Sequence, residues 1–157
     1  MADPDRVLTD VLAALRPGGL LVLVEMDASP FPRCLPDDIW IGRPGLETRA
    51  HAALAHRHSE QVPELGADWG PRLSGAGFTV EGERRSVIDL AVPLPEVTGR
   101  YAQASLHRIR PALEGLLDAE DLTSLDTLLA DDGPDSLLSR TDLSVRTSRS
   151  TWVARRL

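Results

Sequence analysis

The sequence predicts a mixed α/β fold, and two observations carry this prediction. The first is a helical apolar stripe followed by a Pro-Gly-Gly turn and an apolar run, over residues 4–25. The second is the alternation of helical and extended patterns through the rest of the chain, which ends in an alternating segment at 143–155. A length of 157 residues predicts one domain, 1–157, because a chain of this size can bury a sizeable core.

Residues 4–15 predict an amphipathic helix. Asp3 is suited to cap its start, and Pro4 suits the first helical position. Pro17 blocks continuation of the helix, and Gly18-Gly19 allow the chain to reverse direction. The apolar residues that share one face of this helix are Val7, Leu8, Val11, Leu12 and Leu15.

Residues 20–24 predict a β-strand that ends at Glu25. The run from Leu20 to Val24 is apolar without alternation. Such a run is typical of a strand covered on both faces, as in a parallel α/β sheet.

Residues 26–45 predict a loop, because prolines and glycines break any regular element there. Two interpretations stay open. A long loop after the carboxyl end of a strand is where α/β proteins bind ligands, and it can equally be a packed structural crossover. Residues 46–61 then predict a helix that carries His51, His56 and His58. Their spacing matches no zinc pattern, so we expect solvent-facing or core-edge histidines, with a pocket-lining role as the alternative.

The second half continues the alternation. A helix is predicted over 64–76, and Gly75-Ala-Gly77 is its C-terminal cap, since a phosphate-binding turn would follow a strand and open a helix. A strand over 78–91, helices over 100–110 and from the cap Asp118 to 129, a short turn at 135–140 and a strand over 143–155 complete the prediction.

Composition excludes several functional classes. The net charge is −7, which disfavours nucleic acid and anionic membrane surfaces. Cys34 is alone, so no disulfide framework is expected, and the sequence predicts no signal peptide. A cytoplasmic protein is the consistent prediction. The sequence contains no Gly-x-Ser-x-Gly elbow, no His-Glu-x-x-His and no P-loop.

The segment Leu15-Arg-Pro-Gly-Gly-Leu-Leu-Val-Leu-Val-Glu25 resembles the turn and fifth strand of class I S-adenosylmethionine (SAM)-dependent methyltransferases. The segment Leu73-x-x-Ala-Gly-Phe78 resembles the helix before their sixth strand, and Trp152-Val-Ala-Arg-Arg156 is similar to their seventh strand. The resemblance implies a partial Rossmann-like sheet of the fifth, sixth and seventh strands, with a helical insertion around 94–140. It also implies that the last strand lies antiparallel between the other two.

The cofactor motifs of this family have no match. Neither the glycine-rich loop after the first strand nor the acid that ends the second strand is found, so no SAM-binding residue is assigned. The resemblance therefore implies SAM as the cofactor of the family, and a chain that is a fragment lacking the SAM-binding half.

The resemblance does imply an acceptor site near the carboxyl end of the strand at 20–24, beneath the inserted helices. Its catalytic candidates are Glu25 and His107, as general bases in methyl transfer to a small-molecule acceptor. Its substrate-binding candidates are Asp27, Trp40, Tyr101 and Arg110. The alternatives are turn hydrogen bonding for Glu25, and packing or surface ion pairing for Tyr101 and Arg110.

A second functional hypothesis is a non-catalytic binding or dimerisation module derived from a methyltransferase. Without a fourth strand, Leu20–Val24 would present an apolar, unpaired edge. Dimerisation through that edge is the simplest way to cover it.

Overall fold

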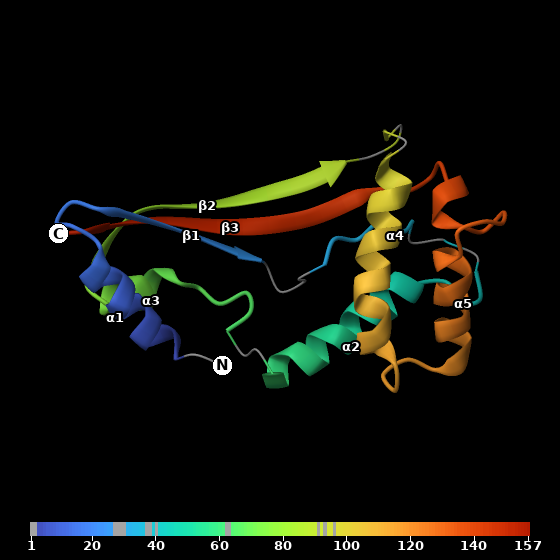
Figure 1. Ribbon diagram of the computed structural model, residues 1–157, viewed down its shortest axis with the longest axis horizontal. Coiled ribbons are helices and arrows are strands. Elements are labelled where there is room, and N and C mark those ends of the chain that lie inside the picture. The colour runs from blue at the N-terminus through green and yellow to red at the C-terminus, as the bar shows by residue number, and fades with distance from the viewer. Residues whose placement is uncertain are drawn as a thin grey trace. The chain divides into compact units, whose positions relative to one another are not determined.

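A computed structural model describes residues 3–26, 31–36, 39, 41–61, 64–90, 92, 94–95 and 97–157. They form a mixed α/β structure with one three-stranded antiparallel sheet and several helices (Figure 1). The strands are β1 (Leu20–Met26), β2 (Phe78–Leu90) and β3 (Val145–Arg156). The helices are α1 (Pro4–Ala14), α2 (Leu46–Gln61), α3 (Gly70–Gly75), α4 (Val97–Ile109) and α5 (Ala119–Leu129), with short 3-10 helices η1 (Arg110–Leu113) and η2 (Leu137–Ser139). None of these helices has the length and apolar character needed to cross a bilayer.

The chain divides into two compact units. Unit 1 holds the described residues within 1–28, 62–87 and 148–157, and unit 2 holds those within 29–61 and 88–147. Unit 1 contains α1, β1, α3 and most of the sheet. Unit 2 contains α2, α4 and α5 with the two 3-10 helices.

The last strand is the centre of the sheet. The order is β1-β3-β2, and β1 pairs with β3 in antiparallel register from Leu20 opposite Arg155 to Met26 opposite Arg149. The predicted position of the last strand, between the two earlier strands and antiparallel to the first, is confirmed.

Helices cover one face of the sheet in unit 1. Figure 1 shows α1 and α3 on the same side of the strands. The core between them consists of Leu8, Leu73, Phe78, Trp152 and Ala154. These side chains are apolar and almost fully buried, so burial of this face drives the packing of both helices.

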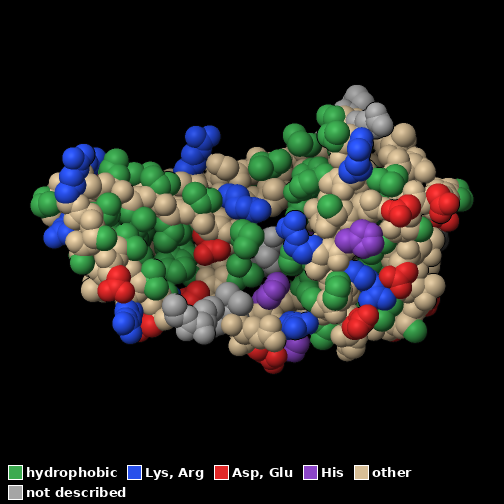
Figure 2. Space-filling view, in the orientation of Figure 1, with side chains coloured by type: hydrophobic (Ala, Val, Ile, Leu, Met, Phe, Trp, Pro, Cys, Tyr) green, Lys and Arg blue, Asp and Glu red, His purple; other side chains and the backbone are tan. Residues whose placement is uncertain are grey.

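The other face of β1 is open among the described residues. Leu21 and Leu23 pack against the core, whereas Leu20, Val22 and Val24 are 48%, 56% and 61% exposed. Figure 2 shows hydrophobic side chains gathered on the surface over this part of the molecule. The prediction that β1 is covered on both faces is therefore wrong for the described part of the chain. A continuous apolar run does not reveal which face a single layer of helices will cover.

Polar contacts fix both ends of α1. The predicted cap is confirmed, because the Asp3 carboxylate accepts a hydrogen bond from the backbone N–H of Asp5 at 3.0 Å. At the other end, Arg156 Nη1 donates to the carbonyls of Leu12 and Ala13 at 2.6 and 3.1 Å. Those carbonyls have no partner within the helix, so a side chain of the last strand supplies it.

Helix α3 is shorter than predicted. The pattern over 64–76 predicts a helix throughout, but only Gly70–Gly75 is helical. Gly66 adopts a positive φ of 76°, which interrupts a helix, and Pro71 favours a new start at its position. The prediction for the end of the helix is confirmed, since Gly77 has φ 98° and leads into β2.

Unit 2 is a helical cluster with its own core. Helix α4 begins at Val97, earlier than predicted. The predicted cap of α5 is confirmed, because the Asp118 carboxylate accepts a hydrogen bond from the backbone N–H of Asp121 at 2.9 Å. The core combines the apolar faces of α2, α4 and α5. Its largest fully buried members include Leu35, Leu46, Ile109, Leu113, Leu125, Leu128 and Leu137.

Asp121 links α5 to the start of α2. Its carboxylate is buried and accepts hydrogen bonds from Arg49 Nε and Nη2 at 2.7 and 2.6 Å, and from Arg43 Nη2 at 2.9 Å. The hydrogen bonds from Arg49 lower the pKa of Asp121 below its ordinary value. The ionised carboxylate is therefore the form that the folded unit prefers.

A second buried carboxylate ties the segment 31–36 to α2. Glu47 accepts from the backbone N–H groups of Cys34 and Leu35 at 2.7 and 3.1 Å. Burial raises the pKa of Glu47, and burial together with the Glu47 charge raises the pKa of Cys34 to about 12. Cys34 is therefore an unreactive thiol at neutral pH.

Replacing Asp121 with Asn is expected to lower the free energy of unfolding by about 2 kcal/mol at pH 7. Removing one partner of a buried ion pair leaves the other charge uncompensated, and the partial exposure of both arginines reduces the cost. Because the folded pKa lies below 3.8, the wild-type advantage should hold above about pH 4 and disappear as the pH falls through the folded pKa. Urea unfolding at several pH values measures both effects. Asp132→Asn, at an exposed turn, is the matched control and should change stability by less than about 0.5 kcal/mol.

Candidate functional site

Glu25 lies at the carboxyl end of β1, and both of its carboxylate oxygens are engaged. Oε1 accepts the backbone N–H of Met26 at 2.8 Å, and Oε2 accepts the indole Nε1–H of Trp69 at 3.1 Å. The turn hydrogen bonding considered for Glu25 is thus present. A carboxylate has about four lone-pair positions, so these two bonds leave room for a further donor.

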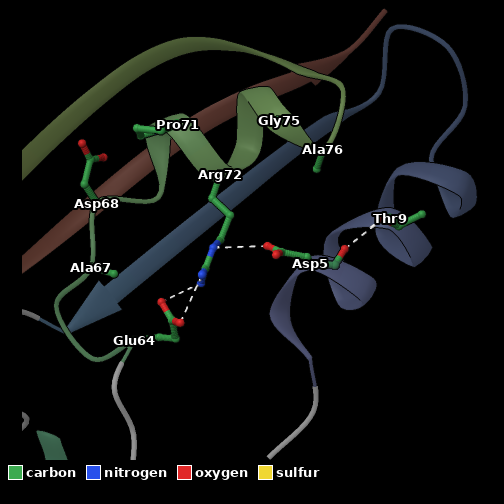
Figure 3. A pocket seen from close by; sticks show the side chains of 9 residues that line it. All are labelled: Asp5, Thr9, Glu64, Ala67, Asp68, Pro71, Arg72, Gly75 and Ala76. Atoms are coloured by element: carbon green, nitrogen blue, oxygen red, sulfur yellow. Dashed lines mark hydrogen bonds and ion pairs between the residues drawn. The ribbon is translucent and has the colours of Figure 1, made fainter.

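Trp69 is held in place by Arg72. The Arg72 guanidinium carbon lies 5.5 Å from the centre of the Trp69 ring, within the range of a cation–π contact. Arg72 in turn forms ion pairs with Asp5 at 3.2 Å and with Glu64 at 2.6 Å. Figure 3 shows Arg72 extending from α3 between Asp5 of α1 and Glu64. A chain of contacts therefore runs from α1 through Arg72 and Trp69 to Glu25.

The same Arg72 lines a cavity of about 610 Å³ beside α1 and α3 (Figure 3). This volume is typical of small-molecule pockets. Three carboxylates and a single guanidinium give its wall a negative balance, which favours a cationic or hydroxyl-bearing ligand over an anion. The lining residues are Asp5, Thr9, Glu64, Ala67, Asp68, Pro71, Arg72, Gly75 and Ala76.

Trp152 lies on the face of the sheet that carries Glu25. It stands opposite Leu23 in the register and is only 2% exposed. Its Nε1–H has no hydrogen-bond partner among the described residues. A Cβ added at Gly70 would lie 3.7 Å from this nitrogen, at ordinary van der Waals distance, so the backbone at the start of α3 lies next to the ring.

The three candidates of the inserted helix lie together in unit 2. Tyr101 and His107 are exposed on α4, and Arg110 follows at the start of η1. Arg110 binds both oxygens of Asp126, at 2.6 and 2.9 Å, and these hydrogen bonds lower the pKa of Asp126. The surface ion pairing considered for Arg110 is therefore present.

The predicted site residues that the structure describes lie in both units. Glu25 belongs to unit 1, whereas Tyr101, His107 and Arg110 belong to unit 2. Asp27 and Trp40 lie outside the described residues. The sequence did not predict three residues near Glu25. Trp69 donates a hydrogen bond to it, Arg72 lines the adjacent cavity, and Trp152 lies on the same face of the sheet. Only tertiary packing brings these residues together.

Histidines form no metal site in the part of the chain that the structure describes. No group of at least three His, Cys, Asp or Glu side chains there is arranged to hold a metal ion.

Two of the histidines pack against other parts of unit 2. The Phe31 and His58 rings stack with centroids 6.4 Å apart. Burial, reinforced by the charge of Arg33, lowers the pKa of His51 to about 4.

Comparisons with known proteins add little to this geometry. No family model matches the sequence, and no curated protein matches it. Among solved structures, a candidate methyltransferase from Bacillus halodurans C-125 matches with a TM-score of 0.40 and 13% identity. The match covers 98% of this chain and 62% of that protein, so this chain spans less than two thirds of its length. A similarity of this size establishes neither a family nor an activity.

The Trp69–Glu25 hydrogen bond is expected to contribute about 1 kcal/mol. A double-mutant cycle tests this, with Trp69→Phe, which keeps a ring and removes the N–H, and Glu25→Ala. Urea unfolding of the wild type, both single variants and the double variant gives the coupling energy. A coupling of zero would show that the hydrogen bond does not stabilise the fold.

Stability is expected to fall as the pH is lowered from about 6.5 to 4. The folded state keeps His51 neutral down to about pH 4, while the unfolded chain binds a proton near 6.5. His51→Gln should flatten this part of the profile, as measured by thermal unfolding at a series of pH values. His56→Gln, at an exposed position of the same helix, should leave it unchanged; equal flattening by both variants would contradict the assignment.

Proposed function

We propose that this chain is the acceptor-side part of a class I SAM-dependent methyltransferase, which transfers a methyl group to a small molecule. The observation that carries the proposal is the strand order β1-β3-β2, with the last strand between the other two and antiparallel to β1. The resemblance of Leu15–Glu25 and of the last strand implies this order for the fifth, seventh and sixth strands. Fold similarity alone does not define an activity, so the chemistry must come from the site.

In the proposed reaction Glu25 receives the proton of the acceptor. Its carboxylate stands at the carboxyl end of β1, with Trp69 and the Met26 N–H fixing its orientation. A general base held in one orientation needs little reorganisation when the proton moves. His107 remains the alternative proposed base. Tyr101 and Arg110 of the inserted segment, and Asp27 and Trp40 of the loop 26–45, remain proposed acceptor contacts.

No SAM-binding residue is assigned among the described residues. The positive-φ glycines next to strands, Gly18 and Gly77, precede β1 and β2. A cofactor loop would instead follow a strand and open a helix. Under this proposal the strands that bind SAM lie outside these 157 residues.

A second candidate function is a non-catalytic dimerisation module. The open apolar face of β1 favours it, because exposed apolar rows on a strand edge are typical of interaction surfaces. The two candidates differ in whether a cofactor-binding region belongs to the functional protein.

Calorimetry with SAM separates the candidates. The 157-residue chain is expected to give no micromolar binding, whereas a protein extended in frame by the upstream coding sequence should bind SAM and transfer a labelled methyl group to a small-molecule acceptor. In the extended protein, Glu25→Gln should lower kcat about 100-fold, since it removes the base and keeps the shape of the side chain.

Either of two results would overturn the proposal. Micromolar SAM binding by the 157-residue chain would mean that the cofactor site is not outside it. An extended protein that binds no SAM would leave the dimerisation module as the better candidate. Glu83→Gln, at an exposed carboxylate of β2 away from the cavity beside α1 and α3, is the matched control for Glu25→Gln and should keep kcat within about 3-fold.

A further inference from the structure

Strand β1 has a neighbour on one side only. All of its residues from Leu20 to Met26 pair with β3, and no other strand in the described part of the chain pairs with them. One row of backbone N–H and C=O groups therefore forms an open edge.

The hydrogen-bond pattern identifies the residues of β1 whose backbone N–H and C=O groups point to this open edge. The Arg156 N–H donates to the Gly19 carbonyl at 2.9 Å, just before Leu20 pairs with Arg155. Antiparallel pairs alternate between bonded and non-bonded, so Leu21 and Leu23 bond to β3, and the backbone groups of Leu20, Val22, Val24 and Met26 point to the open edge. The Met26 N–H accordingly donates to the Glu25 side chain, at 2.8 Å.

The side chains at this edge are apolar and exposed. Leu20, Val22, Val24 and Met26 are 48%, 56%, 61% and 38% exposed, and they share one face of the strand. The single charged residue of β1, Glu25, faces the other way and is held by Trp69. The edge thus combines open hydrogen-bonding groups with an apolar surface.

The opposite edge of the same sheet is protected by charge. Strand β2 carries Glu81, Glu83, Arg84 and Arg85 in its first half, and these charges discourage another strand from pairing. Strand β1 has no proline or basic residue that would do the same. The second half of β2 exposes Val87, Ile88 and Leu90, so only the first half of this edge carries the charges that disfavour pairing, whereas the exposed face of β1 carries no charge at all.

We propose that two copies of this chain pair through β1, antiparallel and two-fold symmetric, with Val22 opposite its own counterpart. This register pairs Leu20 with the Val24 counterpart through the open backbone groups of both strands. Glu25 then stands opposite the Gly19 counterpart, so no like charges meet. A register centred on Leu23 would instead require the Met26 N–H, which Glu25 already occupies.

A second copy fits this edge because the pairing is self-complementary. Every opposed pair on the exposed face is apolar, and a two-fold contact uses the β1 edge of both copies. The inference rests on the second candidate function, the dimerisation module, and not on the methyltransferase role. A strand from a cofactor-binding region would need the same edge, so the two occupants exclude each other.

Disulfide trapping tests the register. Bonded antiparallel pairs have Cα atoms about 5.5 Å apart, within the range of a disulfide. Val22→Cys should therefore form a covalent dimer under mild oxidation, and so should a mixture of Leu20→Cys with Val24→Cys. Leu20→Cys alone should not. Cys34 stays out of the reaction because it is fully buried.

Val87→Cys is the matched control at the other edge strand, where the side chain is 70% exposed. Efficient trapping there, or by Leu20→Cys alone, would overturn the proposed interface. Sedimentation of the full chain should show a concentration-dependent dimer that Val22→Lys converts to a monomer and Val87→Lys does not. A wild-type chain that stays monomeric at all concentrations would overturn the dimer and leave the methyltransferase proposal unaffected.

Discussion

The pairing of β3 with β1 is the interaction on which unit 1 depends. The last strand of the chain lies between two strands that come much earlier in the sequence. Its register is fixed by the pairing with β1, from Leu20 opposite Arg155 to Met26 opposite Arg149. A slip of one residue would turn Trp152 and Ala154 out of the core, because successive side chains point to opposite faces. The same strand supplies Arg156, which binds the carbonyls at the end of α1. One strand therefore holds both the sheet and the helix packed on it.

Buried carboxylates play the corresponding part in unit 2. Asp121 accepts hydrogen bonds from Arg49 of α2 and from Arg43, which precedes that helix. Glu47 accepts hydrogen bonds from the backbone N–H groups of Cys34 and Leu35. A buried carboxylate without such partners would carry a large desolvation cost. These contacts join segments that the apolar core alone would hold in less specific positions.

Glu25 connects the two surfaces of β1. On the inner face its carboxylate accepts a hydrogen bond from Trp69, whose ring also contacts the Arg72 guanidinium. At the edge it takes the N–H of Met26, and so limits how far another strand can pair along β1. A single carboxylate thus contributes to the proposed acceptor site and defines the end of the proposed interface.

The sequence alone determined the order of the elements, the caps Asp3 and Asp118, and the end of α3 at Gly77. It could do so because each of these signals lies within a few residues of the feature that it predicts. The position of the last strand was also predicted, through its resemblance. Only the tertiary structure decided that one face of β1 stays open and that Trp69 meets Glu25, 44 positions away. A continuous apolar run indicates that burial of the strand is favourable. Which of its two faces is buried depends on where helices from distant parts of the sequence pack.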